Sequence, residues 1–411
     1  MVIIKSSAIK IGRSRQYSNQ ISNAPLEQLP SEVRRDIIFG LEYEELSALV
    51  HASPVFHQQY LIDRRVLLCT CLESSLHSSS ITFDVCAVYR TDLLDFSDTR
   101  SRDKTMHFLH SYQDQRFSAD YSIFNEGLAE GEVVEIAAFH FTVIRPLVRQ
   151  YTDWALTNLA DQTKGIQSII PLSKMEEIRL LRAFYRFQLC CNFFGINPDS
   201  SRRFRPGFDY FKILTIFLAF FEPWEVEEMI CVYIFSREMY TQIFKEIHWD
   251  VDASSPKFEG EGPPTPLGAF HLDDASLLTG TISVGLRVLH SVLIARDDGQ
   301  RVIAMQEHIS WPVGDFLECY MGPGWLQSLS VLSEQELMEL RCDALPFGGD
   351  GEPCPTLGWT TLCQGIYRTR YGLYLTDEAI HPWGYVIWDM KRLEDTGGKD
   401  LLVQLAEVEG S

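Results

Sequence analysis

The chain has 411 residues, of which 45% are hydrophobic and 22% charged, with a formal net charge of −20. This composition is typical of a globular protein and excludes a wholly disordered chain, and the length favours more than one domain. So acidic a chain is not expected to bind nucleic acid or an anionic membrane through its overall charge. The stretch from Asp250 to Ser411 holds 25 acidic and 10 basic residues, a balance that fits either simple solubility or a basic target.

The N-terminal segment, residues 1–24, is basic. It carries Lys5, Lys10, Arg13 and Arg15 and no acidic residue, and it lacks the unbroken apolar stretch of a secretory signal. We expect a disordered tail. The alternative is a mitochondrial transit peptide, which is also basic and poor in acidic residues.

Residues 25–70 are predicted to form three short helices. Pro30 is suited to the first turn of a helix, and Ser53-Pro54 combines a favoured N-cap with proline at the first helical position. The helices carry narrow apolar stripes: Val33, Ile37 and Leu41, then Leu46, Leu49 and Val50, then Phe56, Tyr60 and Leu67. Helices this short cannot bury all of their apolar surface among themselves, and an exposed apolar patch marks a protein interface. The residues expected to stay partly exposed are Leu26, Leu29, Pro30, Ile38 and Leu46.

This segment resembles the F-box, a motif that runs Leu-x-x-Leu-Pro-x-Glu-[Ile/Val] and continues with aliphatic residues at helical spacing. The residues that match in order are Leu26, Leu29, Pro30, Glu32, Val33, Ile37, Leu41, Leu46, Leu49, Ser53 and Phe56. Members of the family often have tryptophan where Phe56 stands, so this position departs from the pattern.

The resemblance implies a function in protein degradation. F-box proteins bind a Skp-type adaptor and, through it, the cullin of an SCF ubiquitin ligase, while the rest of the chain holds a protein target. By resemblance, the adaptor-binding residues are Leu26, Leu29, Pro30, Val33, Ile37, Ile38, Leu41, Leu46, Leu49, Ser53 and Phe56.

The middle of the chain is predicted to be helical. Residues 71–130 are polar and rich in serine, which indicates a connector of loops and short helices, whereas residues 131–250 show helical periodicity. Ser173 and Glu176 form a capping box that opens a long helix ending near Gly195. One face of that helix is expected to be buried: Ile178, Leu181, Tyr185 and Leu189. The apolar run from Ile213 to Phe221 predicts a buried helix and is too short to span a membrane, and Pro223 opens the next helix.

Residues 251–268 are rich in proline and glycine and indicate a linker. The C-terminal region, 269–411, is predicted to be mostly helical, with a helix over 274–296, a second capping box at Ser333 and Glu336, and a strand or hairpin over 365–375. The fold class is therefore mainly α. Two further segments resemble those of uncharacterised fungal F-box-type proteins: Pro223-Trp224-Glu225 and Trp383-Gly384-Tyr385-Val386.

Sequence signals for chemistry are weak, and none of the nucleotide-binding, zinc-protease or hydrolase motifs is present. Among the ten cysteines no pair of CxxC units occurs, so reduced thiols are expected and neither a metal nor another cofactor is. Four groups have a less favoured ligand or catalytic interpretation: Cys342, Cys354 and Cys363 with His381; His107 with His110; Asp273-Asp274; and Asp297-Asp298. For the two aspartate pairs we favour a helix cap and a turn, respectively.

A basic stripe of three arginines, Arg179, Arg182 and Arg186, follows the long helix. It is expected to be a solvated face paired with Glu176 and Glu177, the alternative being a grip for a phosphate or an acidic peptide.

The sequence thus predicts a non-catalytic substrate-recognition subunit of a ubiquitin ligase in the cytoplasm or nucleus, acting without nucleic acid or membrane. The alternative is a scaffold or regulatory protein that uses the three helices for another partner. An unrecognised enzyme is the least favoured hypothesis, and it would need a pocket among Asp273, His290, Asp297 or His381.

Overall fold

The structure is a computed structural model. It describes residues 24–92, 101–116, 127–165, 170–196, 213, 216–251, 275–295, 297–310, 316–317, 334–368 and 380–409. Across these residues the fold is mainly α, as predicted, and the pairing of Ala344 with Ile366 is an isolated antiparallel bridge outside any strand. No described helix combines the length and apolar character that crossing a membrane requires.

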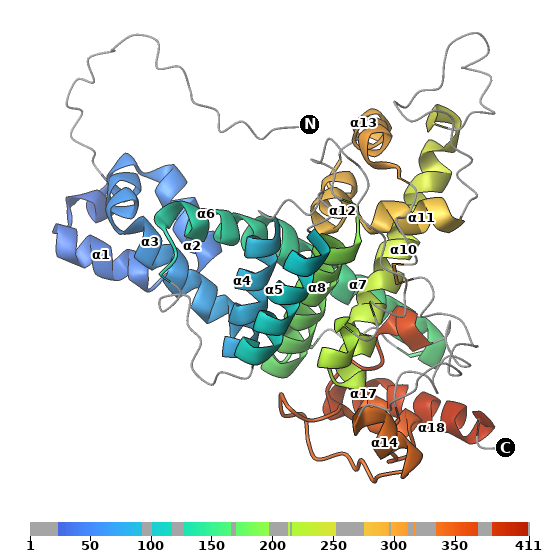
Figure 1. Cartoon of the computed structure of the whole chain (residues 1–411). Helices are drawn as coiled ribbons and strands as arrows, with labels where there is room; N and C mark the ends of the chain where they lie inside the picture. Colours follow the sequence, from blue (N-terminus) through green and yellow to red (C-terminus); the bar gives the residue numbers. More distant parts are fainter. Residues whose placement is uncertain are drawn as a thin grey trace, which may run out of the picture. The chain divides into compact units, whose positions relative to one another are not determined.

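The chain divides into two compact units (Figure 1). Unit 1 comprises Met1–Ser75 and Ser122–Phe141, and unit 2 comprises Leu76–Tyr121 and Thr142–Ser411. This division differs from the succession of segments that the sequence suggested, because each unit contains residues from distant parts of the chain.

Unit 1 contains the three predicted helices together with two further elements. A 3-10 turn, η1 (Pro25–Gln28), precedes α1 (Ser31–Phe39), α2 (Tyr43–Ala52) and α3 (Pro54–Leu76), most of which lies in this unit. Helix α6 (Glu130–Phe139) completes it. The predicted start of α3 is confirmed, since the Ser53 hydroxyl accepts a hydrogen bond from the Phe56 amide at 3.3 Å. Pro30, by contrast, precedes α1 instead of lying in its first turn.

Unit 2 is built around α8 (Lys174–Phe194). The predicted capping box at Ser173 and Glu176 is confirmed, and the helix ends at Gly195 as expected. The helix was predicted to bury one face, but it is buried nearly all round, from Glu176 to Phe194. Helix α8 packs against α4 (Ser79–Asp92), α7 (Arg145–Thr163) and α10 (Pro223–Val251). It is therefore the central helix of the unit.

Figure 1 also shows the remaining elements of unit 2. They are α5 (Ser101–Arg116), η3 (Leu218–Phe220), α11 (Ala275–Ile282), α12 (Leu286–Leu293), α13 (Asp298–His308), α14 (Glu334–Leu340), α15 (Leu357–Leu362), η7 (His381–Trp383), α17 (Met390–Thr396) and α18 (Gly398–Glu409). A π-helical turn, η2 (His140–Ile144), leads into α7, which has Pro146 in its first turn.

Two expectations about these elements are wrong. The segment predicted as a polar connector contains α4, whose residues 81–88 are all buried, because the helix packs against α8. The helix predicted over 274–296 is two helices, α11 and α12, which are separated at Gly285. Gly285 has φ +105° and no room for a side chain, since a Cβ atom there would lie 2.8 Å from Nε2 of Gln188.

Some predicted features lie outside the described residues. These are the basic tail up to residue 23, the linker over 252–268, residues 214–215 of the apolar run, Asp273-Asp274, the cap at Ser333 and the segment over 369–375. The described part of that apolar run is buried at Ile213, Phe217, Leu218 and Phe221.

Candidate functional site

The candidate docking surface lies at the N-terminal end of unit 1, where η1 leads into α1. Two polar side chains hold η1 in place. The Arg34 side chain of α1 donates from Nη1 to the carbonyl oxygens of Glu27 (3.1 Å) and Leu29 (2.5 Å). The Ser53 hydroxyl, at the start of α3, donates to Oε1 of Glu27 at 2.5 Å. The turn is thus connected to both α1 and α3.

The structure distributes the eleven predicted adaptor-binding residues over three environments. Those exposed are Leu26, Pro30 and Val33; those half-buried are Leu29, Ile37, Leu41 and Leu49; those buried are Ile38, Leu46, Ser53 and Phe56. The exposed fraction is 50% for Leu26 and 42% for Val33. The exposed members come from the segment before α1 and from its first turn, so the candidate surface is smaller than the set of matched residues.

The expectation that Ile38 and Leu46 stay partly exposed is wrong. Both lie in the core of unit 1, together with Phe56, Leu67 and Cys71. The buried face of α1 is centred on Ile38, whereas Val33, from the predicted stripe, faces solvent. Two turns of amphipathic pattern do not fix which neighbouring aliphatic residue points inward, and the packing of α2 and α3 decides it.

Unit 1 also exposes apolar side chains that the sequence analysis missed. On α3, Leu61, Ile62 and Val66 are exposed, and the exposed fraction of Ile62 is 78%. The spacing of Ile62 and Val66 by four residues, next to the expected stripe of Phe56, Tyr60 and Leu67, was the signal that could have revealed a second apolar face.

The arginine stripe of α8 is a buried ion-pair network in unit 2, and the expectation of a solvated face is wrong. Arg179, Arg182 and Arg186 are 1–3% exposed. Their partners come from other elements. The two acids expected to pair with them have different partners: Glu176 pairs with Arg392, and Glu177 pairs with His77 and Arg145. A buried charge needs a partner at close range, and adjacent turns of one helix did not provide it here.

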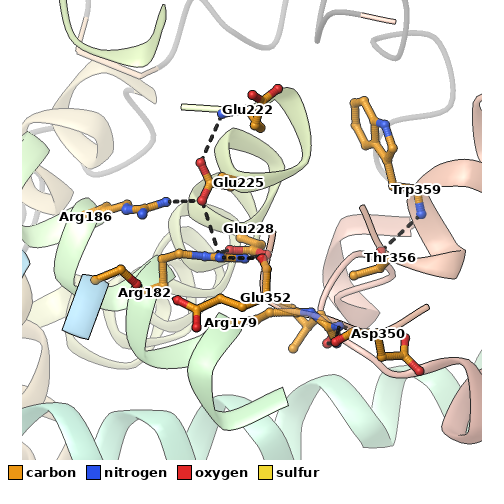
Figure 2. Close-up of polar contacts among 12 residues, drawn as sticks. Arg179, Arg182, Arg186, Glu222, Glu225, Glu228, Asp350, Glu352, Thr356 and Trp359 are labelled. Carbon is orange, nitrogen blue, oxygen red and sulfur yellow. Dashed lines mark hydrogen bonds and ion pairs between the residues drawn. The ribbon is translucent and has the colours of Figure 1, made fainter. Parts of the chain in front are cut away.

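Glu225 lies at the centre of this network (Figure 2). Its carboxylate is 2.8 Å from Nη2 of Arg116, 3.0 Å from Nη1 of Arg186 and 3.3 Å from Nη1 of Arg182. Arg182 also pairs with Glu228 at 2.6 Å. Glu225 belongs to the Pro223-Trp224-Glu225 segment, which forms the start of α10. The ion pairs of Glu225 with Arg182 and Arg186 therefore hold the start of α10 against α8.

Arg186 and Arg179 extend the network to distant parts of unit 2. Nε of Arg186 donates to Asp84 of α4 at 2.9 Å. Arg179 donates to Asp389 at 2.6 Å and to the carbonyl oxygen of Asp350 at 3.1 Å. Figure 2 shows Arg179 beside Asp350 and Glu352, whose segment approaches α8. The alternative interpretation, a free grip for a phosphate or an acidic peptide, is not favoured, since these arginines are already paired.

The pKa values of the central carboxylates are shifted in opposite directions. Burial by itself raises the pKa of Glu225, but the attraction of Arg186, Arg116 and Arg182 is stronger and holds that pKa well below its ordinary value. For Glu228, burial outweighs the attraction of Arg182 and the pKa is raised. The Glu225 carboxylate therefore stays ionised at neutral pH and keeps its attraction to the three arginines.

Three of the four residues proposed for an enzyme are described, and each has its own local environment, whereas Asp273 lies outside the described residues. His381 is buried, and its ring lies 2.7 Å from the carboxylate of Glu227. The same carboxylate accepts a hydrogen bond from the Tyr385 hydroxyl. Asp297 caps α13 by accepting from the Gln300 amide at 2.8 Å, so its predicted turn is in fact an N-cap. His290 is half-buried, and burial lowers its pKa.

The cysteine and histidine groups differ in their exposure to solvent. Cys342 is exposed, Cys354 half-buried and Cys363 buried, and His107 and His110 are exposed on α5. Within the part of the chain that the structure describes, no group of three or more His, Cys, Asp or Glu side chains is arranged to hold a metal ion.

Comparison of the chain with protein-family models, with curated proteins and with solved structures gave no match.

Proposed function

We propose that this chain is the substrate-recognition subunit of an SCF-type ubiquitin ligase of the cytosol or nucleus. Unit 1 binds a Skp-type adaptor, and through it a cullin, and the rest of the chain binds a protein target. The ordered F-box-like residues from Leu26 to Phe56 motivate the proposal. The observation that carries it is that Leu26, Pro30 and Val33 remain exposed although unit 1 has its own buried core.

The motif contains both buried residues, which stabilise the unit, and exposed apolar residues, which are available for binding, and this combination supports the proposed function. Ile38, Leu46 and Phe56 stabilise the unit from inside. Leu26 and Val33 are then available as anchors, and large apolar side chains left on a surface carry binding energy when a partner covers them. A partner that covers them needs no charge complementarity for affinity, which suits a chain as acidic as this one.

The mechanism is proximity. A receptor of this kind performs no covalent chemistry, and its effect comes from holding a target near the ligase that modifies it, which raises the effective concentration of the target.

The proposal is tested by charging the candidate surface in the full chain. Replacing Leu26→Asp together with Val33→Asp places two carboxylates where a partner must exclude water, so we expect the affinity for a purified Skp-type adaptor to fall at least about tenfold. The matched control is Ile62→Asp, which makes the same change at an exposed aliphatic residue of α3 outside the match. Binding is measured by biolayer interferometry, and folding by circular dichroism.

Three outcomes are informative. Loss of binding in the double variant with binding retained in the control supports the adaptor surface. Equal affinity of the double variant and the unaltered chain contradicts it. If the unaltered chain does not bind the adaptor at all, the ligase proposal fails, and the alternative of a scaffold that uses unit 1 for another partner is favoured.

A further inference from the structure

The conformation of η1 depends on the side chains around it. The turn has only four residues, and its backbone bonds include those from the Glu27 amide to the Ala24 carbonyl oxygen at 3.0 Å and from the Leu29 amide to the Leu26 carbonyl oxygen at 3.4 Å. A single helical turn is marginal by itself in water. It carries Leu26 and leads into Pro30, two exposed residues of the candidate surface.

Glu27 is the link between this turn and the start of α3. One carboxylate oxygen, Oε1, accepts the hydrogen bond from the Ser53 hydroxyl at 2.5 Å. The other, Oε2, is buried and makes no hydrogen bond within the described residues. A carboxylate removed from water depends strongly on the donor that it retains.

Ser53 has two roles that substitution can separate. Its Oγ atom accepts from the Phe56 amide and so caps α3, and its hydroxyl proton is donated to Glu27. Aspartate caps a helix as well as serine does, but an ionised aspartate has no proton to donate. Asparagine provides both an acceptor and a donor.

We propose that Glu27 and Ser53 form a latch that holds η1 in the conformation in which Leu26 and Pro30 meet the adaptor. Both residues act through the turn and are positioning residues for the docking surface. This inference rests on the proposed function, and it adds that the surface is assembled by a specific hydrogen bond across 26 residues of sequence.

The experiment uses three variants of the full chain: Ser53→Asp, Ser53→Asn and the double variant Glu27→Gln with Ser53→Asp. In the first, two carboxylates face each other and the latch opens while the cap on α3 persists. In the double variant the new amide can donate to the new carboxylate, so the hydrogen bond is restored with its direction reversed. Hydrogen exchange of the Glu27 and Leu29 amides reports the turn without any partner, and affinity for a purified Skp-type adaptor reports the surface.

We expect Ser53→Asp to speed the exchange of these two amides at least about tenfold and to weaken adaptor binding by a similar factor. Ser53→Asn and the double variant are expected to stay within about threefold of the unaltered chain in both measurements. Rescue by the double variant is the result that a purely structural role for Ser53 does not predict.

Each contrary result has a definite meaning. Unchanged exchange in Ser53→Asp shows that the hydrogen bond does not hold the turn, and the latch is then wrong. Faster exchange with unchanged affinity shows that the turn is held but does not position the adaptor surface, which also overturns the inference. If the unaltered chain binds no adaptor, the proposed function fails, while the exchange data still show whether η1 is held by Ser53.

Discussion

At the scale of single residues, Glu225 shows how a charge is tolerated in the interior of unit 2. Arg116, Arg182 and Arg186 surround its carboxylate, and Arg182 and Arg186 also have carboxylate partners in Glu228 and Asp84. Removing one member of such a network leaves the others buried without compensation, which costs far more than the loss of a surface ion pair. The helical spacing of these arginines predicted a solvated face, and that prediction was wrong because their acidic partners lie far away along the chain.

The variant Glu225→Gln is expected to lower the free energy of unfolding by about 3–5 kcal/mol at neutral pH. Because the folded chain holds the pKa of Glu225 below its ordinary value of 4.5, the stability that its charge contributes is present above pH 4.5 and is lost as the pH falls below that value. The difference between the two proteins should therefore shrink in acid. Urea unfolding at a series of pH values measures it, with Glu334→Gln, at an exposed ion pair, as the control that changes little. A difference that stays constant down to pH 3 contradicts this account.

At the scale of elements, Gly285 explains why one expected helix is two. Its backbone adopts φ +105°, which residues with a side chain rarely adopt, and the Gln188 side chain of α8 occupies the space where a Cβ would be. Oε1 of Gln188 accepts a hydrogen bond from the Leu286 amide at 2.8 Å and so satisfies the first backbone amide of α12. The break is thus made by a glycine and stabilised by a side chain from another helix.

The variant Gly285→Ala is expected to destabilise unit 2 by about 1–3 kcal/mol, because alanine is strained at this φ and displaces Gln188. The matched control is Gly131→Ala in α6, where a Cβ has open space and where a gain of about 0.4–1 kcal/mol is expected from the lower entropy of the unfolded chain. Urea unfolding followed by circular dichroism compares the two, and a loss of similar size in both variants refutes the argument from local geometry.

At the scale of the whole chain, the C-terminal residues are part of the core of unit 2. Trp383, Tyr385 and Trp388 are completely buried, and the indole N–H of Trp388 donates to the carbonyl oxygen of Trp383 at 2.6 Å. Arg392 of α17 pairs with Glu176 at the start of α8 at 2.6 Å. The last described segment packs onto α7 and α10 and forms ion pairs with α8, so unit 2 is complete only when this segment is in place.

Two tryptophan variants test this arrangement. Trp388→Ala is expected to lower the free energy of unfolding by about 3–5 kcal/mol, since it leaves a cavity and removes a buried hydrogen bond. Trp249→Ala, at a residue that is 60% exposed near the end of α10, is expected to change it by no more than about 0.5 kcal/mol. Thermal and urea unfolding of both variants measure these changes. Similar decreases in the free energy of unfolding of the two variants would show that the C-terminal segment is not part of the core.

Local signals in the sequence determined much of the secondary structure. Ser53 caps α3, Ser173 and Glu176 open α8, and Pro223 opens α10, as predicted. Each of these signals acts within one helical turn, so the information needed to recognise it lies in a few adjacent residues. The mainly α fold follows from the same signals and from helical periodicity.

Only the tertiary structure decided which side chains face inward and which charges are paired. The aliphatic residues of α1 allowed either Val33 or Ile38 to be exposed, and the packing of α2 and α3 buried Ile38. The arginines of α8 found their partners on α4, on α10 and near residue 389. Burial and ion pairing depend on groups that are distant in sequence and close in space, and for that reason periodicity along a single helix could not reveal them.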